Sequence, residues 1–347
     1  MNVRTASLLP VFALAALAAC GQDQENASDR SGATAAAPQA QARTNAAFSR
    51  EAVDAASFSA EAAASQDRTP AVLRAQVLLD RARFSPGIID GKPGENVRQA
   101  VAAFEKAYEL PVDGQLDAAV FQKLTQLDNR PALADYEITA ADVKGPFIQS
   151  VPQELEDKGK LPAMSYTSAL EGLAEKFHAT EELLQTLNPG ADFSKAGTRI
   201  VVPDVANQQL PSAVASIEVN RAEREVRVYD AEKKLLAFYP ATIGSDVLPT
   251  PSGSLKVSGV APEPDYTFDP AKLNWDGAKT KVTVKPGPNN PVGSVWIDLN
   301  KPTYGIHGTD EPRTIGKAVS HGCVRLTNWD AEELASQVKP GVPVRFL

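Results

Sequence analysis

Prolines interrupt this chain often and limit how long its helices and strands can run. There are 26 prolines among 347 residues, somewhat more than average usage, which favours loops, linkers and β-rich parts over a helical bundle. The chain is also longer than the size at which one hydrophobic core keeps growing, so two or three domains are expected. Its net charge is −8 and its basic residues are not clustered, which argues against nucleic acid as a partner.

The N-terminal 20 residues have the layout of an export signal. Arg4 supplies a positive charge, residues 8–17 form an apolar run, and two alanines precede Cys20. The run is shorter than the roughly 20 apolar residues that cross a bilayer, and the whole layout is typical of a cleaved signal peptide. The position of Cys20 resembles a bacterial lipobox. A plain secretory signal with an incidental cysteine is the alternative.

The lipobox resemblance implies that residues 1–19 are a lipoprotein signal peptide. It also implies that the thiol of Cys20 is lipidated and anchors the chain to a membrane of the bacterial cell envelope, facing the periplasm. Gly21, in place of Asp, favours the outer membrane over the inner one. Cys323 is then the only free thiol of an exported chain. Because exported cysteines are normally paired, a lone one indicates a reactive thiol or an intermolecular bond.

Composition and turn signals divide the next part of the chain. Residues 20–69 are rich in Ala, Gln, Ser, Thr and Asn and predict a flexible linker after the lipidated cysteine. Residues 70–129 predict three short amphipathic helices separated by turns at Asp90-Gly91 and Asp113-Gly114. This pattern resembles the small three-helix peptidoglycan-binding domain, with Glu105 at a position where the family often has Gln. A structural bundle without a ligand is the alternative.

Residues 130–206 predict two further helices followed by a strand. Apolar residues at helical spacing end at Phe177, Thr180 is placed to cap a second helix, and residues 197–203 have the composition of a strand. The order resembles a βααβ LysM-like module, although the Gly-Asp-Thr that usually precedes the first helix is missing. The resemblance implies that the module binds glycan. His178 is interpreted as a structural or surface residue.

Residues 213–347 are predicted to form a mainly-β domain. Short runs at strand length alternate apolar and polar residues, and Gly and Pro separate them. One helix follows, with Asn328 or Asp330 as its N-terminal cap. The whole chain is therefore predicted to be a multidomain α+β protein, in which a mainly-β domain follows two smaller modules.

The last segment carries a thiol with two histidines near it in the sequence. His307 and His321 both lie within 16 residues of Cys323. A thiol needs a base to attack a carbonyl at neutral pH, because free cysteine has a pKa near 8.5, and an imidazole can take the proton. The sequence spacing alone does not rank the two histidines.

Glycines and an arginine beside these residues fit the same chemistry. Gly308 and Gly322 allow close approach of backbone to a reacting carbonyl, and the N–H groups of Gly322 and Cys323 are candidates for an oxyanion hole. Arg325 lies two residues from the thiol, on the same face of an extended chain. Its guanidinium is suited to a substrate carboxylate.

Two motifs together carry a specific resemblance. Gly305-Ile306-His307-Gly308-Thr309 and Ser320-His321-Gly322-Cys323-Val324-Arg325-Leu326 look like the YkuD-type L,D-transpeptidase catalytic domain over about residues 213–347, and segments at 250–253 and 287–293 are similar in the expected order. The resemblance implies Cys323 as nucleophile and His307 as proton acceptor and donor, held by the carbonyl of Gly308. It implies that His321 and Gly322 shape the oxyanion region, and that Ser320, Thr309 and Arg325 contact substrate. No cofactor or metal is implied.

The implied reaction is acyl transfer on peptidoglycan stem tetrapeptides. The thiol attacks the carbonyl of the third stem residue, and the terminal D-Ala leaves, so that a thioester remains. An amine then reacts with the thioester. A stem amine gives a 3→3 cross-link, and a lysine of an envelope lipoprotein gives a protein attached to peptidoglycan. With water as acceptor, the same thiol gives an L,D-carboxypeptidase or amidase. The remaining alternatives are a zinc site at His307, His321 and Cys323, a redox thiol, and a non-catalytic peptidoglycan-binding lipoprotein.

Overall fold

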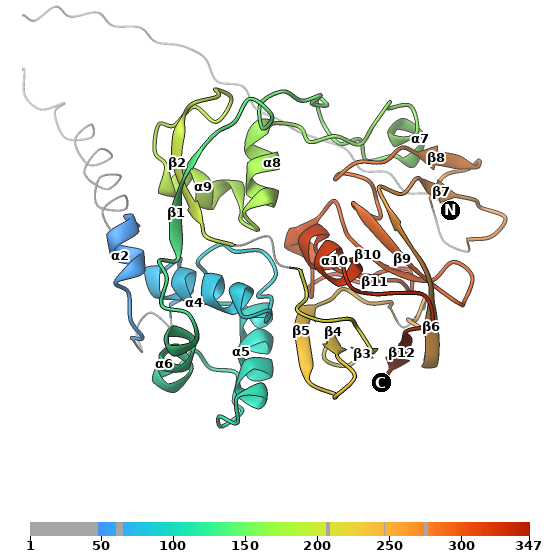
Figure 1. Ribbon diagram of the computed structural model, residues 1–347. Coiled ribbons are helices and arrows are strands. Elements are labelled where there is room, and N and C mark those ends of the chain that lie inside the picture. Colours follow the sequence, from blue (N-terminus) through green and yellow to red (C-terminus); the bar gives the residue numbers. More distant parts are fainter. Residues whose placement is uncertain (1–47, 60–64, 206–208, 246, 274–276) are drawn as a thin grey trace, which may run out of the picture. The chain divides into compact units, whose positions relative to one another are not determined.

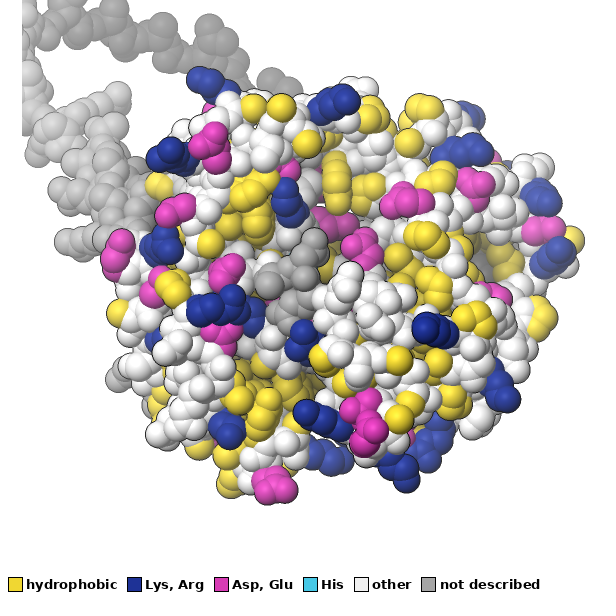
Figure 2. All heavy atoms as spheres, viewed as in Figure 1, with side chains coloured by type: hydrophobic (Ala, Val, Ile, Leu, Met, Phe, Trp, Pro, Cys, Tyr) yellow, Lys and Arg dark blue, Asp and Glu magenta, His cyan; other side chains and the backbone are white. Residues whose placement is uncertain are grey.

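The computed structural model describes residues 48–59, 65–205, 209–245, 247–273 and 277–347 (Figure 1). The predicted signal peptide, Cys20 and most of the predicted linker lie outside the described residues. The described residues all belong to one compact unit. Among these residues, no helix is both long and apolar enough to cross a membrane. On the face shown in Figure 2, basic and acidic side chains are interspersed, as expected for a chain without basic clusters.

Three helices form the first module at the positions that the sequence predicts. They are α4 (Pro70–Arg81), α5 (Glu95–Ala107) and α6 (Ala118–Leu127). Thr69 caps α4 by accepting a hydrogen bond from the N–H of Val72, and Asp117 caps α6 in the same way. The helices share a core around Phe104, which is fully buried and meets Phe84 edge to face at 5.3 Å between ring centroids.

Both Asp-Gly turns of this module are held by a side chain from the helix before them. Gln76 Oε1 of α4 accepts hydrogen bonds from the N–H groups of Asp90 at 3.2 Å and Gly91 at 2.7 Å. Glu105 Oε2 of α5 accepts the corresponding pair from the 113–114 turn, at 3.0 and 2.8 Å. The departure from Gln at Glu105 therefore keeps the acceptor oxygen that the turn needs.

The middle module pairs two strands, with three helices between them in sequence. Strands β1 (Leu133–Glu137) and β2 (Arg199–Pro203) are antiparallel, with α7 (Leu155–Lys158), α8 (Ala169–Lys176) and α9 (Glu181–Leu187) between them in sequence. The predicted cap is present, since the hydroxyl of Thr180 accepts a bond from the N–H of Leu183. After α9, the side chain of Asn188 makes two hydrogen bonds to the backbone of Val201 in β2, at 2.6 and 2.7 Å. These bonds tie the end of the helix to the sheet.

The packed part of the chain starts before residue 70. Helix α2 (Arg50–Asp54) is capped by Ser49, and Phe48 and Val53 are buried in the core of the middle module. Asp54 Oδ1 accepts a hydrogen bond from the N–H of Ala132 at 2.6 Å. The structure therefore differs from the predicted flexible linker at this end, because two apolar side chains in an otherwise polar segment find a core to pack against.

An eight-stranded sheet is the base of the last module, which confirms the mainly-β prediction. The strand order is β11-β10-β9-β6-β12-β3-β4-β5, and the pairs β10–β11 and β12–β3 are parallel. A separate hairpin pairs β7 with β8. The strands are β3 (Ser216–Asn220), β4 (Glu225–Tyr229), β5 (Leu235–Pro240), β6 (Gly253–Pro262), β7 (Tyr266–Phe268), β8 (Val282–Val284), β9 (Val295–Leu299), β10 (Gly305–His307), β11 (Val324–Arg325) and β12 (Pro343–Phe346).

Helix α10 (Asn328–Ala335) packs on β9 and β10. Its N-cap is Thr327, whose hydroxyl accepts a hydrogen bond from the N–H of Asp330. The prediction of Asn328 or Asp330 as the cap is therefore wrong. Both side chains are used elsewhere: Asn328 bonds to the loops around it, and Asp330 accepts a hydrogen bond from Ser85 of the first module.

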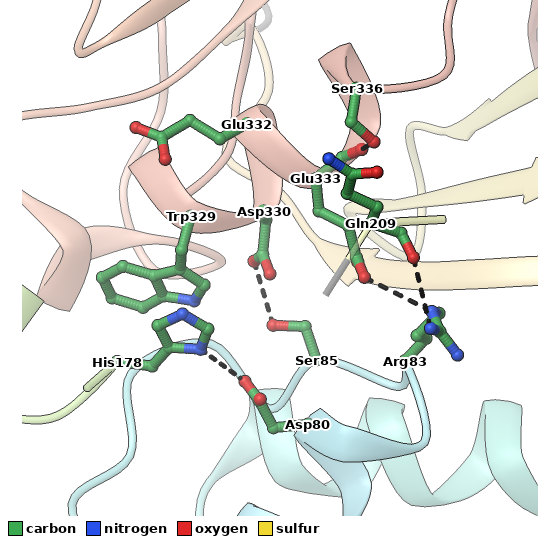
Figure 3. A pocket seen from close by; sticks show the side chains of 10 residues that line it. All are labelled: Asp80, Arg83, Ser85, His178, Gln209, Trp329, Asp330, Glu332, Glu333 and Ser336. Carbon is green, nitrogen blue, oxygen red and sulfur yellow. Dashed lines mark hydrogen bonds and ion pairs between the residues drawn. The ribbon is translucent and has the colours of Figure 1, made fainter. Parts of the chain in front are cut away.

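The three modules meet at a cavity of about 260 Å³ (Figure 3). His178 of the middle module donates from Nδ1 to Asp80 of α4 at 2.9 Å, and its ring stacks on Trp329 of α10 with the centroids 4.9 Å apart. Beside them, the hydroxyl of Ser85 donates to Asp330 at 2.9 Å. These contacts agree with the interpretation of His178 as a structural residue. Burial of the Asp330 carboxyl raises its pKa to about 8.

Replacing Asp330 with asparagine is expected to stabilise the chain at pH 8. The folded-state pKa of Asp330 lies above the unfolded value of about 3.9, so the folded chain keeps a proton that the unfolded chain releases. The stabilising contribution is complete below about pH 4 and is lost as the pH rises towards 8, by at most about 1.4 kcal/mol per pH unit. Asparagine is always neutral and still accepts the bond from Ser85. Urea unfolding between pH 5 and 8 should give a flatter pH profile for Asp330→Asn than for the wild type, and parallel profiles would contradict this account.

Candidate active site

Two short parallel strands set the geometry of the site. In the pairing of β10 with β11, Ile306 lies opposite Val324 and His307 opposite Arg325. Side chains alternate along each strand, so His307 and Arg325 emerge on one face, and Cys323, two residues before Arg325, emerges there too. A slip of one residue would send these side chains to the opposite face. The sheet register therefore brings together the thiol, the imidazole and the guanidinium.

These three side chains line one cavity of about 430 Å³. Ser320 and His321 also line it, as the sequence predicts for a common site. The rest of the wall is mostly apolar and includes Pro264, Tyr266, Leu273, Pro291, Val292 and Trp296. A concave apolar site with a few convergent polar groups is the usual form of a small-ligand or catalytic pocket.

His307 is buried, with 3% of its surface exposed, and its ring is held on two sides. Nδ1 donates to the carbonyl of Gly308 at 2.7 Å, which is the contact that the sequence predicts, and Trp296 stacks on the ring at 5.2 Å between centroids. Because Nδ1 carries the proton, Nε2 of the neutral ring is free to accept one. Burial and the nearby Arg325 guanidinium lower the pKa of His307 to about 3, so the ring is neutral at physiological pH.

Cys323 is protonated in the resting site. Burial raises the pKa of its thiol, although the N–H of Gly305 and the charge of Arg325 oppose this effect. The Sγ atom donates weakly to the carbonyl of Thr303 at 3.5 Å. The site thus pairs a neutral thiol with a neutral imidazole instead of a thiolate with an imidazolium. Such a pair transfers a proton only as the sulfur attacks.

The Ser320–Cys323 loop is closed by the side chain of Ser320. Its hydroxyl donates to the carbonyl of Cys323 at 2.6 Å and accepts from the N–H of Gly322 at 3.1 Å. The N–H of Gly322 is therefore used inside the loop, in contrast to its predicted part in an oxyanion hole. Gly322 has a φ of 115°, which requires glycine. Ser320 itself is 3% exposed, so its main contacts shape the loop.

Thr309 does not line the cavity, in contrast to the predicted substrate contact. It is 2% exposed, its N–H donates to Asn328 Oδ1 at 3.0 Å, and its hydroxyl accepts from the N–H of Glu311 at 3.1 Å. The chain turns after His307, so the residue two positions later points behind the site. Thr309 thus helps to hold the backbone next to His307 in place.

Arg325 and His321 complete the polar side of the cavity. The side chain of Arg325 lines the cavity, where its guanidinium is suited to a substrate carboxylate. Within the described residues, its buried Nε atom has no hydrogen-bond partner. His321 lies at the cavity edge, and its partial burial together with Arg325 lowers its pKa. Both histidines are therefore neutral near pH 7, and the ring of His307 is held by a carbonyl and by an aromatic ring.

Sequence reasoning missed Tyr266 and Trp296, which form part of the cavity wall. Trp296 stands opposite His307 in the antiparallel pair β9–β10, and burial raises the pKa of Tyr266 to about 12. Trp296 lies in one of the short runs at strand length that the sequence shows, but its pairing with His307 depends on the register of the sheet.

The zinc alternative finds no support in the described residues. No group of three or more His, Cys, Asp or Glu side chains in them is arranged to hold a metal ion. Cys323 is a free thiol, and Cys20 lies outside the described residues.

Comparison with known proteins agrees with this geometry. Residues 215–345 match the family model of the YkuD L,D-transpeptidase catalytic domain, and residues 68–124 match that of a peptidoglycan-binding domain. The YkuD protein of Bacillus licheniformis, named as an L,D-transpeptidase, is 34% identical over 178 residues, which is 50% of this chain and 91% of that protein. YcfS of Escherichia coli K12 carries the same kind of name and is 33% identical over 190 residues, or 52% of this chain and 58% of that protein.

Solved structures also resemble part of the chain. The catalytic domain of the L,D-transpeptidase of E. faecium acylated by ertapenem covers 39% of this chain and 98% of that domain, at 24% identity and a TM-score of 0.32. The sequence matches carry the assignment: the chain belongs to the L,D-transpeptidase family and is a cysteine-dependent L,D-transpeptidase that acts on peptidoglycan.

Proposed function

We propose that Cys323 is the nucleophile of this L,D-transpeptidase and that Nε2 of His307 accepts the thiol proton. The observation that carries the proposal is the register of β10 and β11. This register directs the side chains of His307, Arg325 and Cys323 towards the same cavity. The bond from Nδ1 to Gly308 supports the assignment, since it leaves Nε2 as the acceptor. His321 lines the same cavity and is assigned to shaping its edge.

The first half-reaction forms a thioester. The thiol proton moves to His307 as Sγ attacks the carbonyl carbon of the third stem residue, meso-diaminopimelate, in a donor tetrapeptide. The bond from that carbon to the nitrogen of the terminal D-Ala then breaks, and D-Ala leaves with the proton from His307. We assign the N–H of Cys323 to the developing oxyanion, because that of Gly322 is used within the loop. Arg325 binds a carboxylate of the donor.

The second half-reaction decides the product. A diaminopimelate side-chain amine of another stem gives a 3→3 cross-link, and a lysine of an envelope lipoprotein gives a protein attached to the wall. Water would give an L,D-carboxypeptidase or amidase with the same acyl-enzyme. The apolar wall around Cys323 favours an amine acceptor over water, because it limits the solvent near the thioester.

The parts in front of the catalytic domain are proposed to hold the enzyme at the wall. We propose a peptidoglycan-binding domain over residues 70–129 and a catalytic domain over residues 213–347, and the family matches over 68–124 and 215–345 support these bounds. For residues 130–206 we propose a LysM-like module that contacts glycan, and the order β1, α8, α9, β2 supports it. A signal peptide over 1–19, lipidation of Cys20 and a periplasm-facing position at the outer membrane follow from the sequence motif alone.

Incubation of the full chain with a carbapenem is expected to add one molecule to Cys323. The Cys323→Ala variant should show no mass increase, because the residues that the structure describes contain no other thiol. Intact-protein mass spectrometry measures both. A folded wild-type chain that stays unmodified would instead favour a non-catalytic peptidoglycan-binding lipoprotein.

Products from a purified disaccharide-tetrapeptide donor separate transfer from hydrolysis. Dimers linked 3→3 are expected, and exclusively monomeric tripeptides would assign the chain to the hydrolases. Co-sedimentation of the Cys323→Ala chain with purified sacculi tests wall binding separately from catalysis.

A further inference from the structure

We propose that Asn328 and Glu175 are positioning residues for His307, so that helix α8 of the middle module completes the active site of the catalytic domain. The inference rests on the proposed role of His307 as proton acceptor. It gives the middle module a task in the reaction that needs no contact with the wall.

The peptide unit between Gly308 and Thr309 holds the ring of His307. Its C=O accepts the hydrogen bond from Nδ1 of His307 at 2.7 Å, and its N–H donates to Oδ1 of Asn328 at 3.0 Å. Both bonds act on one rigid planar group, so a rotation of that plane would move the acceptor away from the ring. The bond to the N–H also polarises the C=O and strengthens it as an acceptor. Asn328 therefore fixes the group that sets the tautomer of His307.

The amide of Asn328 can adopt one orientation only. Asn328 is 1% exposed. Oδ1 accepts from the N–H groups of Thr309 at 3.0 Å and Ser294 at 3.1 Å, while Nδ2 donates to Glu175 Oε1 at 2.7 Å and to the carbonyl of Pro288 at 3.2 Å. With the amide turned over, Nδ2 would face two N–H donors and Oδ1 would face a carboxylate and a carbonyl.

The backbone around this amide has no room for side chains. A Cβ atom at Gly308 would lie 2.1 Å from Oδ1 of Asn328, and one at Gly293 would lie 2.0 Å from the same atom. Glycine at both positions lets the backbone reach the amide oxygen from two sides. Glycine at both positions therefore makes room for the side chain of Asn328.

Glu175 brings the middle module into this network. It belongs to α8, and its carboxylate makes the shortest of the four bonds to Asn328. A hydrogen bond to an ionised acceptor is stronger than a neutral one. Tyr166 donates to the same oxygen at 3.3 Å, which helps to hold the carboxylate in place. Burial raises the pKa of Glu175 to about 7 although the bond from Asn328 opposes this.

A second contact holds the loop that carries Pro288. Asn289 Nδ2 donates to Glu171 of α8 at 2.8 Å and to the carbonyl of Ser165 at 3.0 Å. Helix α8 therefore fixes Asn328 directly through Glu175 and indirectly through the neighbouring loop. Movement of α8 away from the catalytic domain would break the hydrogen bond from Asn328 Nδ2 to Glu175, which helps to fix the orientation of the amide.

Rates of Cys323 acylation by a carbapenem, measured on the full chain, test the proposal. Glu175→Ala is expected to be slowed by roughly tenfold, since small misplacement of a catalytic group costs rates of this order or more. Glu175→Gln should recover most of the rate, because its amide oxygen still accepts from Asn328. Ser85→Ala is the matched control: it removes another inter-module bond to α10, the one to Asp330 at 2.9 Å, and should react at the wild-type rate.

The tautomer of His307 separates positioning from general stability. In a chain labelled with 15N at histidine, the ring nitrogens of His307 should report the Nδ1–H tautomer in the wild type and in Glu175→Gln. A mixture of tautomers is expected in Glu175→Ala and Asn328→Ala. A merely structural role would lower the melting temperature without changing the tautomer.

Two outcomes would overturn the proposal: a wild-type acylation rate in Glu175→Ala, or an unchanged tautomer in both alanine variants. If Asn328→Ala does not fold, Glu175→Ala compared with Glu175→Gln decides the question. A wild-type chain that no carbapenem acylates would contradict the proposed function instead, and the tautomer comparison would still decide the positioning role.

Discussion

Replacing His307 with glutamine is expected to slow acylation of Cys323 by a factor of about 10² to 10⁴, the range for loss of a general base. Glutamine fills a similar space but cannot take the thiol proton. The reaction left in the variant then depends on the small fraction of thiolate. Stopped-flow measurement of β-lactam loss on the full chain gives the rate directly.

The pH profile makes this prediction specific. The pKa of His307 is lowered to about 3 and that of the Cys323 thiol is raised, so in the wild type both groups keep their neutral forms between pH 5 and 8. The acylation rate should be nearly flat across that window. In His307→Gln the rate should rise about tenfold per pH unit, because the thiolate fraction rises by that factor below the thiol pKa.

His321→Gln is the control for this experiment, because His321 lines the same cavity. We expect a smaller loss than in His307→Gln and a profile that stays flat. A larger loss in His321→Gln, or a bell-shaped wild-type profile with a limb near pH 6, would assign the base to His321.

Replacing Arg81 with methionine is expected to cost roughly 3 kcal/mol of unfolding free energy, because it breaks a buried ion pair on one side. The guanidinium is 1% exposed and lies 2.5 Å from Asp128. It also donates to the carbonyl of Pro131 at 2.8 Å and reaches Asp204 at 3.5 Å. One side chain of α4 thus joins the end of α6 to both ends of the middle module. Urea unfolding at pH 7 measures the loss.

Arg130→Met is the matched control, since Arg130 pairs with the same carboxylate at 2.7 Å but is 57% exposed. An exposed pair contributes about 0–1 kcal/mol. Burial raises the pKa of Asp128, but the bonds from Arg130 and Arg81 outweigh it and hold the pKa well below its usual range. This stabilisation is present above about pH 4 and is lost as the pH falls further. Equal losses in the two variants would contradict the assigned difference in burial.

Local patterns in the sequence predict the elements of this protein better than they predict side-chain partners. Helical spacing and Asp-Gly turns predict α4, α5 and α6, and the motif around Cys323 predicts the thiol, both histidines and the contact from His307 to Gly308. These features depend on residues close together in the chain. The order of α8, α9 and β2 could be predicted in the same way, because each of the two helices has its own N-terminal cap.

Partners distant in the sequence could not be predicted. Ser320 turns into its own loop and Thr309 points behind the site, since the course of the backbone decides where a hydroxyl ends. Asn328 has a side chain that often caps helices, yet here it accepts a hydrogen bond from the N–H of Thr309, and Thr327 is the N-cap of α10. Glu175 meets it from 153 residues away, and only the packing of α8 on the catalytic domain brings the two together.

The neutral state of Cys323 also bears on the chemical survival of the enzyme. Peroxides and other oxidants attack thiolates far faster than thiols, and the raised pKa of Cys323 keeps the sulfur protonated between turnovers. For an enzyme that acts on peptidoglycan, this resting state slows conversion of the thiol to sulfenic and higher acids. The sulfur becomes reactive only when an acyl donor is bound and the thiol proton moves to His307. The cavity that activates the sulfur therefore also protects it from oxidation between turnovers.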